Sequence, residues 1–140
     1  MTAMKLWIAI AIVVAGQAAT TTSDKTTLTG VYAEAQAKRG EALYAEKCSS
    51  CHGPDLAGLD VAPALAGADF NTNWSDLSLN DLAERIRVSM PADSPDSLSR
   101  QQVADLVAFL LKRGNFPAGE AELPAEAETL KGIRFLAKKP

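Results

Sequence analysis

Both cysteines and the only histidine of this 140-residue chain fall within five consecutive positions, Cys48-Ser49-Ser50-Cys51-His52. The spacing C-x-x-C-H is the attachment signature of a c-type haem. Two thiols spaced in this way can add to the two vinyl groups of the porphyrin, and the adjacent imidazole can then ligate the iron. We therefore predict one covalently attached haem c per chain, held by Cys48 and Cys51, with His52 as an axial ligand.

Two other interpretations of the same residues have less support. A C-x-x-C pair can be the redox dithiol of a thioredoxin-like protein, but that motif opens a helix after a strand, and no βαβ pattern surrounds it here. Two cysteines can also form half of a zinc site, but structural zinc takes four protein ligands. The chain has no second Cys/His pair to supply the other two.

The second axial ligand is predicted from the methionines. Met1 and Met4 lie in a predicted targeting segment, so Met90 is the methionine left in the mature chain, 38 residues after His52 and next to Pro91. A methionine in apolar surroundings is usually core filling. Here its uniqueness and its place at an expected helix end favour a ligand, because His/Met is an axial pair known from electron-transfer haems.

A His52/Met90 pair would close both axial positions of the iron. The thioether is a soft donor that favours Fe(II), so this pair raises the reduction potential relative to stronger donors. With no open coordination position for oxygen, peroxide or a small-molecule substrate, one-electron transfer is the expected function.

Composition is that of one small domain. Hydrophobic residues make up 47% of the chain and aromatic residues 6%, so a large buried cofactor would supply apolar material that the side chains lack. The formal net charge is -3, without a basic stripe, which gives no case for nucleic-acid binding. Mixed charges flank Met90, among them Arg87, Arg100 and Asp96, and we interpret them as a solvated surface.

The N-terminus is typical of a targeting segment. Lys5 precedes the apolar run of residues 6–15, and small residues follow it, which predicts a signal peptide over residues 1–19 and export to the periplasm. An uncleaved membrane anchor is the alternative, although the run is shorter than the roughly 18 residues of a spanning helix. The Thr-rich residues 20–30 are expected to form a flexible tether.

Helical signals organise the remaining chain into a domain over residues 31–114. We expect helices over residues 31–47, 78–89 and 99–113, the last two beginning with capping boxes at Ser78 and Ser99. Residues 53–67 and 91–98 are predicted loops, and residues 69–75 are expected to be irregular. Residues 115–140 are interpreted as a C-terminal strap over the same domain, with a docking element as the alternative.

Trp74 is a tentative addition to the haem site. Its indole N–H could donate a hydrogen bond at the haem edge, and ordinary core filling is an equally good interpretation.

Several of these residues together resemble the class I c-type cytochromes, over about residues 35–114. The resemblance rests on residues before, within and after the haem motif: Gly40, Tyr44, CSSCH itself, Pro63, Met90-Pro91, Leu106 and Phe109. It implies an all-α fold of three to five helices wrapped around one haem, with the N- and C-terminal helices crossing. It also implies that the Pro63 carbonyl orients the imidazole of His52.

The resemblance is greatest to small periplasmic cytochromes associated with quinoprotein (PQQ-dependent) alcohol dehydrogenases. It implies an electron carrier rather than an enzyme, whose partners include such a dehydrogenase and a terminal oxidase. A haem subunit of a dehydrogenase or oxidase complex is a second possibility. An open-site haem enzyme or gas sensor, with Met90 only packing, is a third. A monomer or a subunit of a complex is expected.

Overall fold

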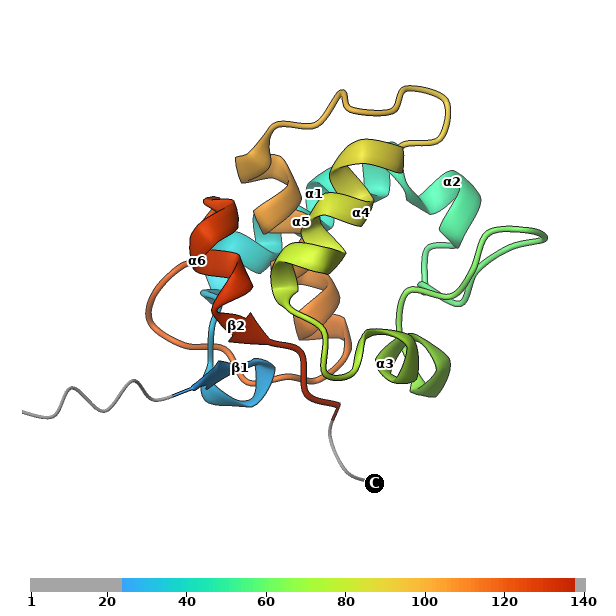
Figure 1. Cartoon of the computed structure of the whole chain (residues 1–140). Coiled ribbons are helices and arrows are strands. Elements are labelled where there is room, and N and C mark those ends of the chain that lie inside the picture. Colours follow the sequence, from blue (N-terminus) through green and yellow to red (C-terminus); the bar gives the residue numbers. More distant parts are fainter. Residues whose placement is uncertain (1–23, 138–140) are drawn as a thin grey trace, which may run out of the picture.

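The computed structural model describes residues 24–137, and within that range the chain is mostly helical (Figure 1). Its elements in chain order are β1 (Lys25–Thr26), a 3-10 turn (Thr27–Thr29), α1 (Glu34–Lys47), α2 (Ser49–His52), α3 (Ala68–Trp74), α4 (Leu79–Ser89), α5 (Arg100–Arg113), α6 (Ala127–Lys131) and β2 (Ile133–Arg134). The expected all-α fold is confirmed. No helix within residues 24–137 combines the length and apolarity needed to span a bilayer. The predicted signal peptide lies outside the described residues.

The crossing of α1 and α5 forms the centre of the core. A Cβ atom placed on Gly40 would lie 1.9 Å from the carbonyl oxygen of Asp105 and 2.9 Å from Cβ of Phe109. One turn further along α1, the ring of Tyr44 packs against that of Phe109, with centroids 5.2 Å apart. The N- and C-terminal helices therefore cross at the residues that the sequence indicated, and Gly40 permits their close approach.

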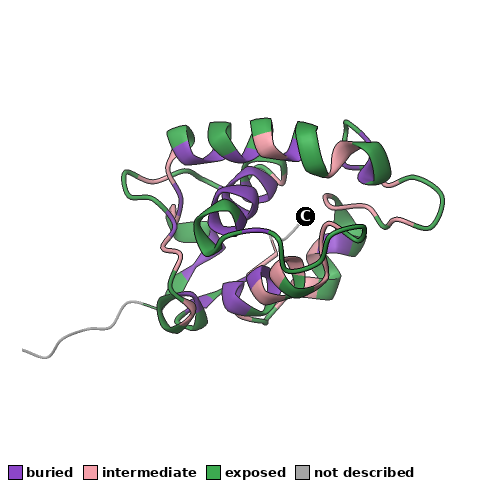
Figure 2. Cartoon of the chain, turned by 90° about the horizontal axis from the view of Figure 1, so that it is seen from above, coloured by how far each residue is buried: buried purple, intermediate pink, exposed green. Residues whose placement is uncertain are grey.

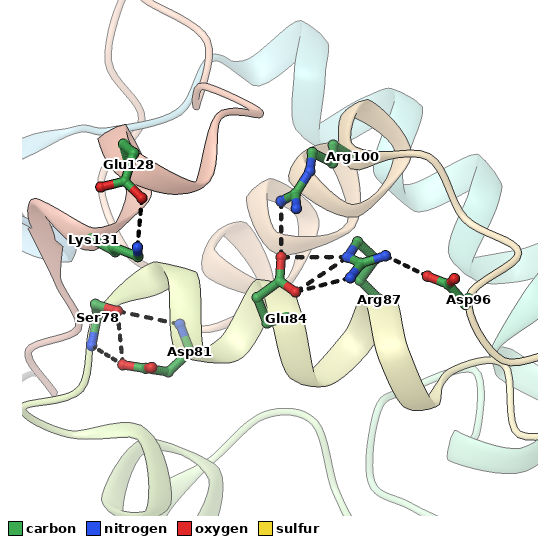
Figure 3. Close-up of polar contacts among 8 residues, drawn as sticks. All are labelled: Ser78, Asp81, Glu84, Arg87, Asp96, Arg100, Glu128 and Lys131. Carbon is green, nitrogen blue, oxygen red and sulfur yellow. Dashed lines mark hydrogen bonds and ion pairs between the residues drawn. The ribbon is translucent and has the colours of Figure 1, made fainter.

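The two capping boxes are present as predicted. The Ser78 hydroxyl accepts from the backbone N–H of Asp81, and the Asp81 carboxylate accepts from the Ser78 N–H (Figure 3). Ser99 and Gln102 make the same reciprocal pair at the start of α5. Each box satisfies backbone donors that a helix start leaves without an intrahelical partner.

Residues 69–75, expected to be irregular, are mostly helical in α3. The sequence gave no start signal, because Gly67 occupies the N-cap position and provides no side-chain cap. Packing explains the helix instead. Phe70 is buried, and its ring lies 6.2 Å from those of both Trp74, four residues later, and Phe135 in the C-terminal segment. Tertiary contacts often stabilise helices too short to form alone.

The described part of the expected tether, residues 24–30, is also ordered. β1 pairs in parallel with β2, with Lys25 opposite Ile133. Thr27 is fully buried, and its hydroxyl bonds both the carbonyl and the N–H of Leu136 at 2.9 and 3.0 Å. Residues 24–30 are therefore not a flexible tether, because their hydroxyl groups replace backbone bonds that a longer sheet would provide.

The C-terminal segment wraps back over α1. Its apolar side chains are almost completely buried: Phe116, Leu123, Leu130, Ile133 and Phe135. The Tyr32 hydroxyl donates to the carbonyl of Phe116 at 2.9 Å, and the Gln36 amide bonds both backbone groups of Leu123. In Figure 2 the buried residues gather on the helix sides that face one another.

An arginine joins α1, α5 and this segment. Arg39 donates to both carboxylate oxygens of Asp105 at 3.0 Å and to both oxygens of Glu122 at 2.9 Å. The hydrogen bonds from Arg39 hold the pKa of Glu122 below its usual range. Asp105 is buried, and a buried carboxylate requires such a partner.

Replacing Gly40 with alanine tests the helix crossing. Alanine normally favours a helix by up to about 1 kcal/mol over glycine. Here we expect Gly40→Ala to lower the free energy of unfolding by about 2 kcal/mol or more, because the added methyl group forces α1 and α5 apart. Gly132→Ala is the control, since its Cβ would meet no atom closer than 3.4 Å. Urea unfolding measures both, and equal stability of the two variants would contradict the expectation.

Candidate functional site

Cys48, Cys51 and His52 lie on a single helical turn at one end of the molecule. α1 ends at Lys47, and the chain turns into α2, with the N–H groups of Cys51 and His52 both donating to the carbonyl of Cys48. Both thiols are free, Cys48 half-buried and Cys51 exposed. Figure 1 shows α2 far from the strand pair β1–β2. The turn therefore presents two thiols and an imidazole together.

The environment of the thiols does not resemble that of a redox dithiol. Burial, with a smaller contribution from Cys51, raises the pKa of the Cys48 thiol to about 11. Thioredoxin-like pairs instead lower the pKa of their nucleophilic thiol. Within residues 24–137 no three His, Cys, Asp or Glu side chains converge as a metal-binding cluster. The arrangement fits neither dithiol exchange nor a structural zinc site.

The His52 ring is buried and oriented by Pro63. Its Nδ1 lies 2.8 Å from the Pro63 carbonyl oxygen. A carbonyl only accepts hydrogen bonds, so in the neutral ring Nδ1 carries the proton and Nε2 keeps its lone pair for a metal. This tautomer is the one that an axial iron ligand requires when the Nδ1 side faces the protein.

The loop after the motif folds back to bring Pro63 to the histidine. The Gly58 N–H donates to the carbonyl of His52 at 2.9 Å. Gly58 has a positive φ of 81°, and a Cβ there would lie 2.5 Å from the Ala62 oxygen and 2.9 Å from the Pro63 carbonyl carbon. Only glycine allows both the turn and the contact. Sequence reasoning missed this residue, although the glycine-rich loop 53–67 was a signal for it.

Tyr44 supports the motif from α1. Its buried hydroxyl donates to the carbonyl of Gly53 at 2.6 Å, directly after His52. The sequence analysis named Tyr44 only as part of the family resemblance and did not indicate this hydrogen bond. Burial is the main cause that raises the pKa of the Tyr44 hydroxyl to about 12, so it remains a donor at neutral pH.

Met90 and Trp74 come from other elements. Met90 is the half-buried C-cap of α4, its N–H donates to the Ile86 carbonyl at 2.9 Å, and a cis peptide links it to Pro91. Trp74 is the half-buried last residue of α3. The structure brings Pro63 into direct contact with His52, whereas neither Met90 nor Trp74 makes a hydrogen bond to the CSSCH turn within the described residues.

The side chains present fit a c-type haem. Two free thiols and an imidazole with its Nδ1 engaged lie together on the CSSCH turn. Leu65, Trp74 and Ile86 each pack on the core yet remain only partly buried, which suits contact with a flat apolar group.

Comparison with known proteins gives three findings. Residues 35–110 match the family model described as cytochrome c oxidase, cbb3-type, subunit III. The chain is 38% identical over 79 residues to a thiosulfate dehydrogenase of Allochromatium vinosum, which covers 51% of this chain and 29% of the relative. The crystal structure of the sulfane dehydrogenase SoxCD from Paracoccus pantotrophus is similar with a TM-score of 0.49 and 24% identity, over 77% of this chain and 62% of that chain. The matched part is less than a third of the curated relative.

Tyr44→Phe tests the hydroxyl behind the histidine. Losing this buried hydrogen bond should lower the free energy of unfolding at neutral pH by about 1–2 kcal/mol. The wild-type protein should lose stability as pH rises from about 10 to 12, because the unfolded phenol ionises near 10 while the folded phenol keeps its proton. The variant lacks the phenol, so its stability should fall less over that range in urea unfolding experiments.

Tyr32→Phe is the matched control for Tyr44→Phe. The buried Tyr32 hydroxyl donates to the carbonyl of Phe116, away from the motif. Its removal should lower the free energy of unfolding at neutral pH by a similar amount. Haem absorption should then change in Tyr44→Phe alone. Identical haem spectra in both variants and the wild type would contradict a role for Tyr44 at the site.

Proposed function

This chain belongs to the family described as cytochrome c oxidase, cbb3-type, subunit III, and we propose that it carries single electrons through one covalently attached haem c. The matched residues, 35–110, form a c-type cytochrome domain. When bound, the haem supplies a one-electron Fe(III)/Fe(II) couple.

The contact between His52 and Pro63 is the observation that carries the proposal. Cys48 and Cys51 would hold the macrocycle covalently, and His52 would ligate the iron through Nε2, because the Pro63 carbonyl engages Nδ1 at 2.8 Å. A fixed tautomer and ring orientation make the imidazole a stronger and better-defined donor. The Gly58 and Tyr44 hydrogen bonds to residues 52 and 53 support the same turn.

We propose Met90 as the opposite axial ligand. It is the methionine that follows the predicted signal segment, and it ends α4 where the chain turns away from the core. A thioether in this position raises the reduction potential and excludes oxygen or a substrate from the iron. The protein would then be an electron carrier and not itself a catalyst.

The electron donor is a separate proposal. The sequence resemblance suggests a quinoprotein (PQQ-dependent) alcohol dehydrogenase, whereas the relative named thiosulfate dehydrogenase suggests an enzyme of sulfur-compound oxidation. We favour the second, as a free carrier or as a haem subunit of such a dehydrogenase, because 38% identity over 79 residues supports it. A terminal oxidase is the proposed acceptor, and the periplasm, reached by a signal peptide or an N-terminal anchor, is the proposed location.

Donor preference can be measured directly. The oxidised protein is mixed with a thiosulfate-oxidising dehydrogenase and thiosulfate, or with a quinoprotein alcohol dehydrogenase and ethanol. We expect haem reduction, followed by absorption, to be faster by about tenfold or more with the sulfur enzyme, since electrostatic and shape complementarity set encounter rates. Faster reduction by the quinoprotein would favour the other donor.

Met90→Leu tests the axial ligand. The haem should stay attached through Cys48 and Cys51, but the weak red absorption band of an Fe(III)–methionine bond should disappear. The reduction potential should fall by on the order of 0.1 V, a fraction of the roughly 0.8 V range that axial ligands span. Absorption spectra and a redox titration of the purified haem protein measure both effects.

Val88→Leu is the control, since Val88 lies in the same helix α4 and is 51% exposed. It should keep the red band and the potential. An open-site enzyme or gas sensor would lack the band in the wild type and bind carbon monoxide rapidly, and that result would refute the proposed carrier.

A further inference from the structure

The loop that follows Met90 is tied back to α4 at a single residue, Arg87. The N–H of Asp96 donates to the Arg87 carbonyl oxygen at 3.1 Å, and the Arg87 guanidinium donates to the Asp96 carboxylate (Figure 3). Backbone and side chain of Asp96 thus bond the same partner. These two bonds close a ring of chain from residue 87 to residue 96, and Met90 lies inside that ring.

The arginine is itself held in place. Glu84 accepts from Nε and Nη2 of Arg87 at 3.2 Å, and its other oxygen accepts from Arg100 at the start of α5 at 2.8 Å. In Figure 3, Glu84, Arg87 and Asp96 lie in a row, and Arg100 lies above Glu84. The hydrogen bonds to Glu84 therefore hold the Arg87 guanidinium in an orientation that faces the loop, and this orientation does not depend on Asp96.

We propose that Arg87 and Asp96 position Met90, by keeping the loop closed so that the thioether stays at the iron. This inference rests on the proposed ligation by Met90. A loop closed at its ends has fewer conformations, so its motions carry a ligand within it away from the metal less often. Arg87 and Asp96 are positioning residues that act through the chain.

The exposure of the Arg87–Asp96 ion pair indicates that it contributes little to the global stability of the fold. The Asp96 side chain is 67% exposed and that of Arg87 is 26% exposed, and ion pairs this accessible to water contribute little to folding. Beyond Asp96, buried Leu98 and the Ser99 cap fix the chain independently. Loss of the pair should therefore loosen residues 91–95 and leave the core intact.

Asp96→Asn and Asp93→Asn form the decisive comparison. Both remove one negative charge from the same loop, but only Asp96 pairs with Arg87, while Asp93 accepts from the neighbouring Ser94 hydroxyl. Asp96 has a positive φ of 60°, which asparagine also adopts readily, so the backbone need not change. Imidazole is added to the oxidised haem proteins, because its saturating binding rate reports how often the methionine leaves the iron.

We expect Asp96→Asn to raise that limiting rate about two- to fivefold, the range typical for loss of an accessible ion pair. Asp93→Asn should leave the rate unchanged. Urea unfolding should differ little among the three proteins, and amide exchange should be faster in Asp96→Asn within residues 91–95 only. The double variant Arg87→Gln/Asp96→Asn should be no faster than the faster of its two single variants, because both remove the same contact.

Each contrary outcome is informative. An unchanged rate in Asp96→Asn, an equal rise in Asp93→Asn, or additive effects in the double variant would overturn the positioning role while leaving Met90 ligation intact. Absence of the red Fe(III)–methionine band in the wild type would overturn the ligation and this inference together.

Discussion

The contact of Gly40 with the backbone of α5 is the constraint on which the rest of the structure depends. A Cβ atom on Gly40 would lie only 1.9 Å from the carbonyl oxygen of Asp105, so the backbones of α1 and α5 are in close contact at this point. This contact fixes the position of one helix relative to the other. Tyr44, one turn along, then reaches the carbonyl of Gly53, and the haem motif begins one turn after that. Arg39 and Gln36 on the same helix bind the C-terminal segment. One helix therefore sets the positions of both the site and the strap.

Features that arise from residues close together in the chain could be predicted from the sequence, and features that arise from distant contacts could not. Capping boxes at Ser78 and Ser99 involve residues three apart, so they could be predicted with their helix starts. The haem motif is equally local. α3 could not be predicted, because Phe70 is buried against Phe135, 65 residues later in the chain. The order of residues 24–30 was missed for the same reason, since Leu136, the partner of Thr27, is distant in sequence.

The same division applies within the candidate site. Cys48, Cys51 and His52 were apparent from spacing, and the role of Pro63 came from a family resemblance and not from its own surroundings. Gly58 and the hydroxyl of Tyr44 were missed, because their contacts depend on how the loop folds back. Arg87 and Asp96 were interpreted as solvated surface charges, since no pattern in the sequence indicates that they bond each other in two ways. A sequence motif identifies the residues that bind the haem, whereas the residues that hold them in position become apparent only from the tertiary structure.

The parallel pairing of β1 with β2 has a consequence for how this unit can be combined with others. Within residues 24–137 the pairing places the first and last regular elements side by side, at the end of the molecule away from α2 (Figure 1). A polypeptide that enters and leaves a domain at adjacent points can be extended or spliced into a larger architecture with little disturbance. The unit is thus suited to modular reuse, with its thiol-bearing turn projecting away from whatever is joined to it.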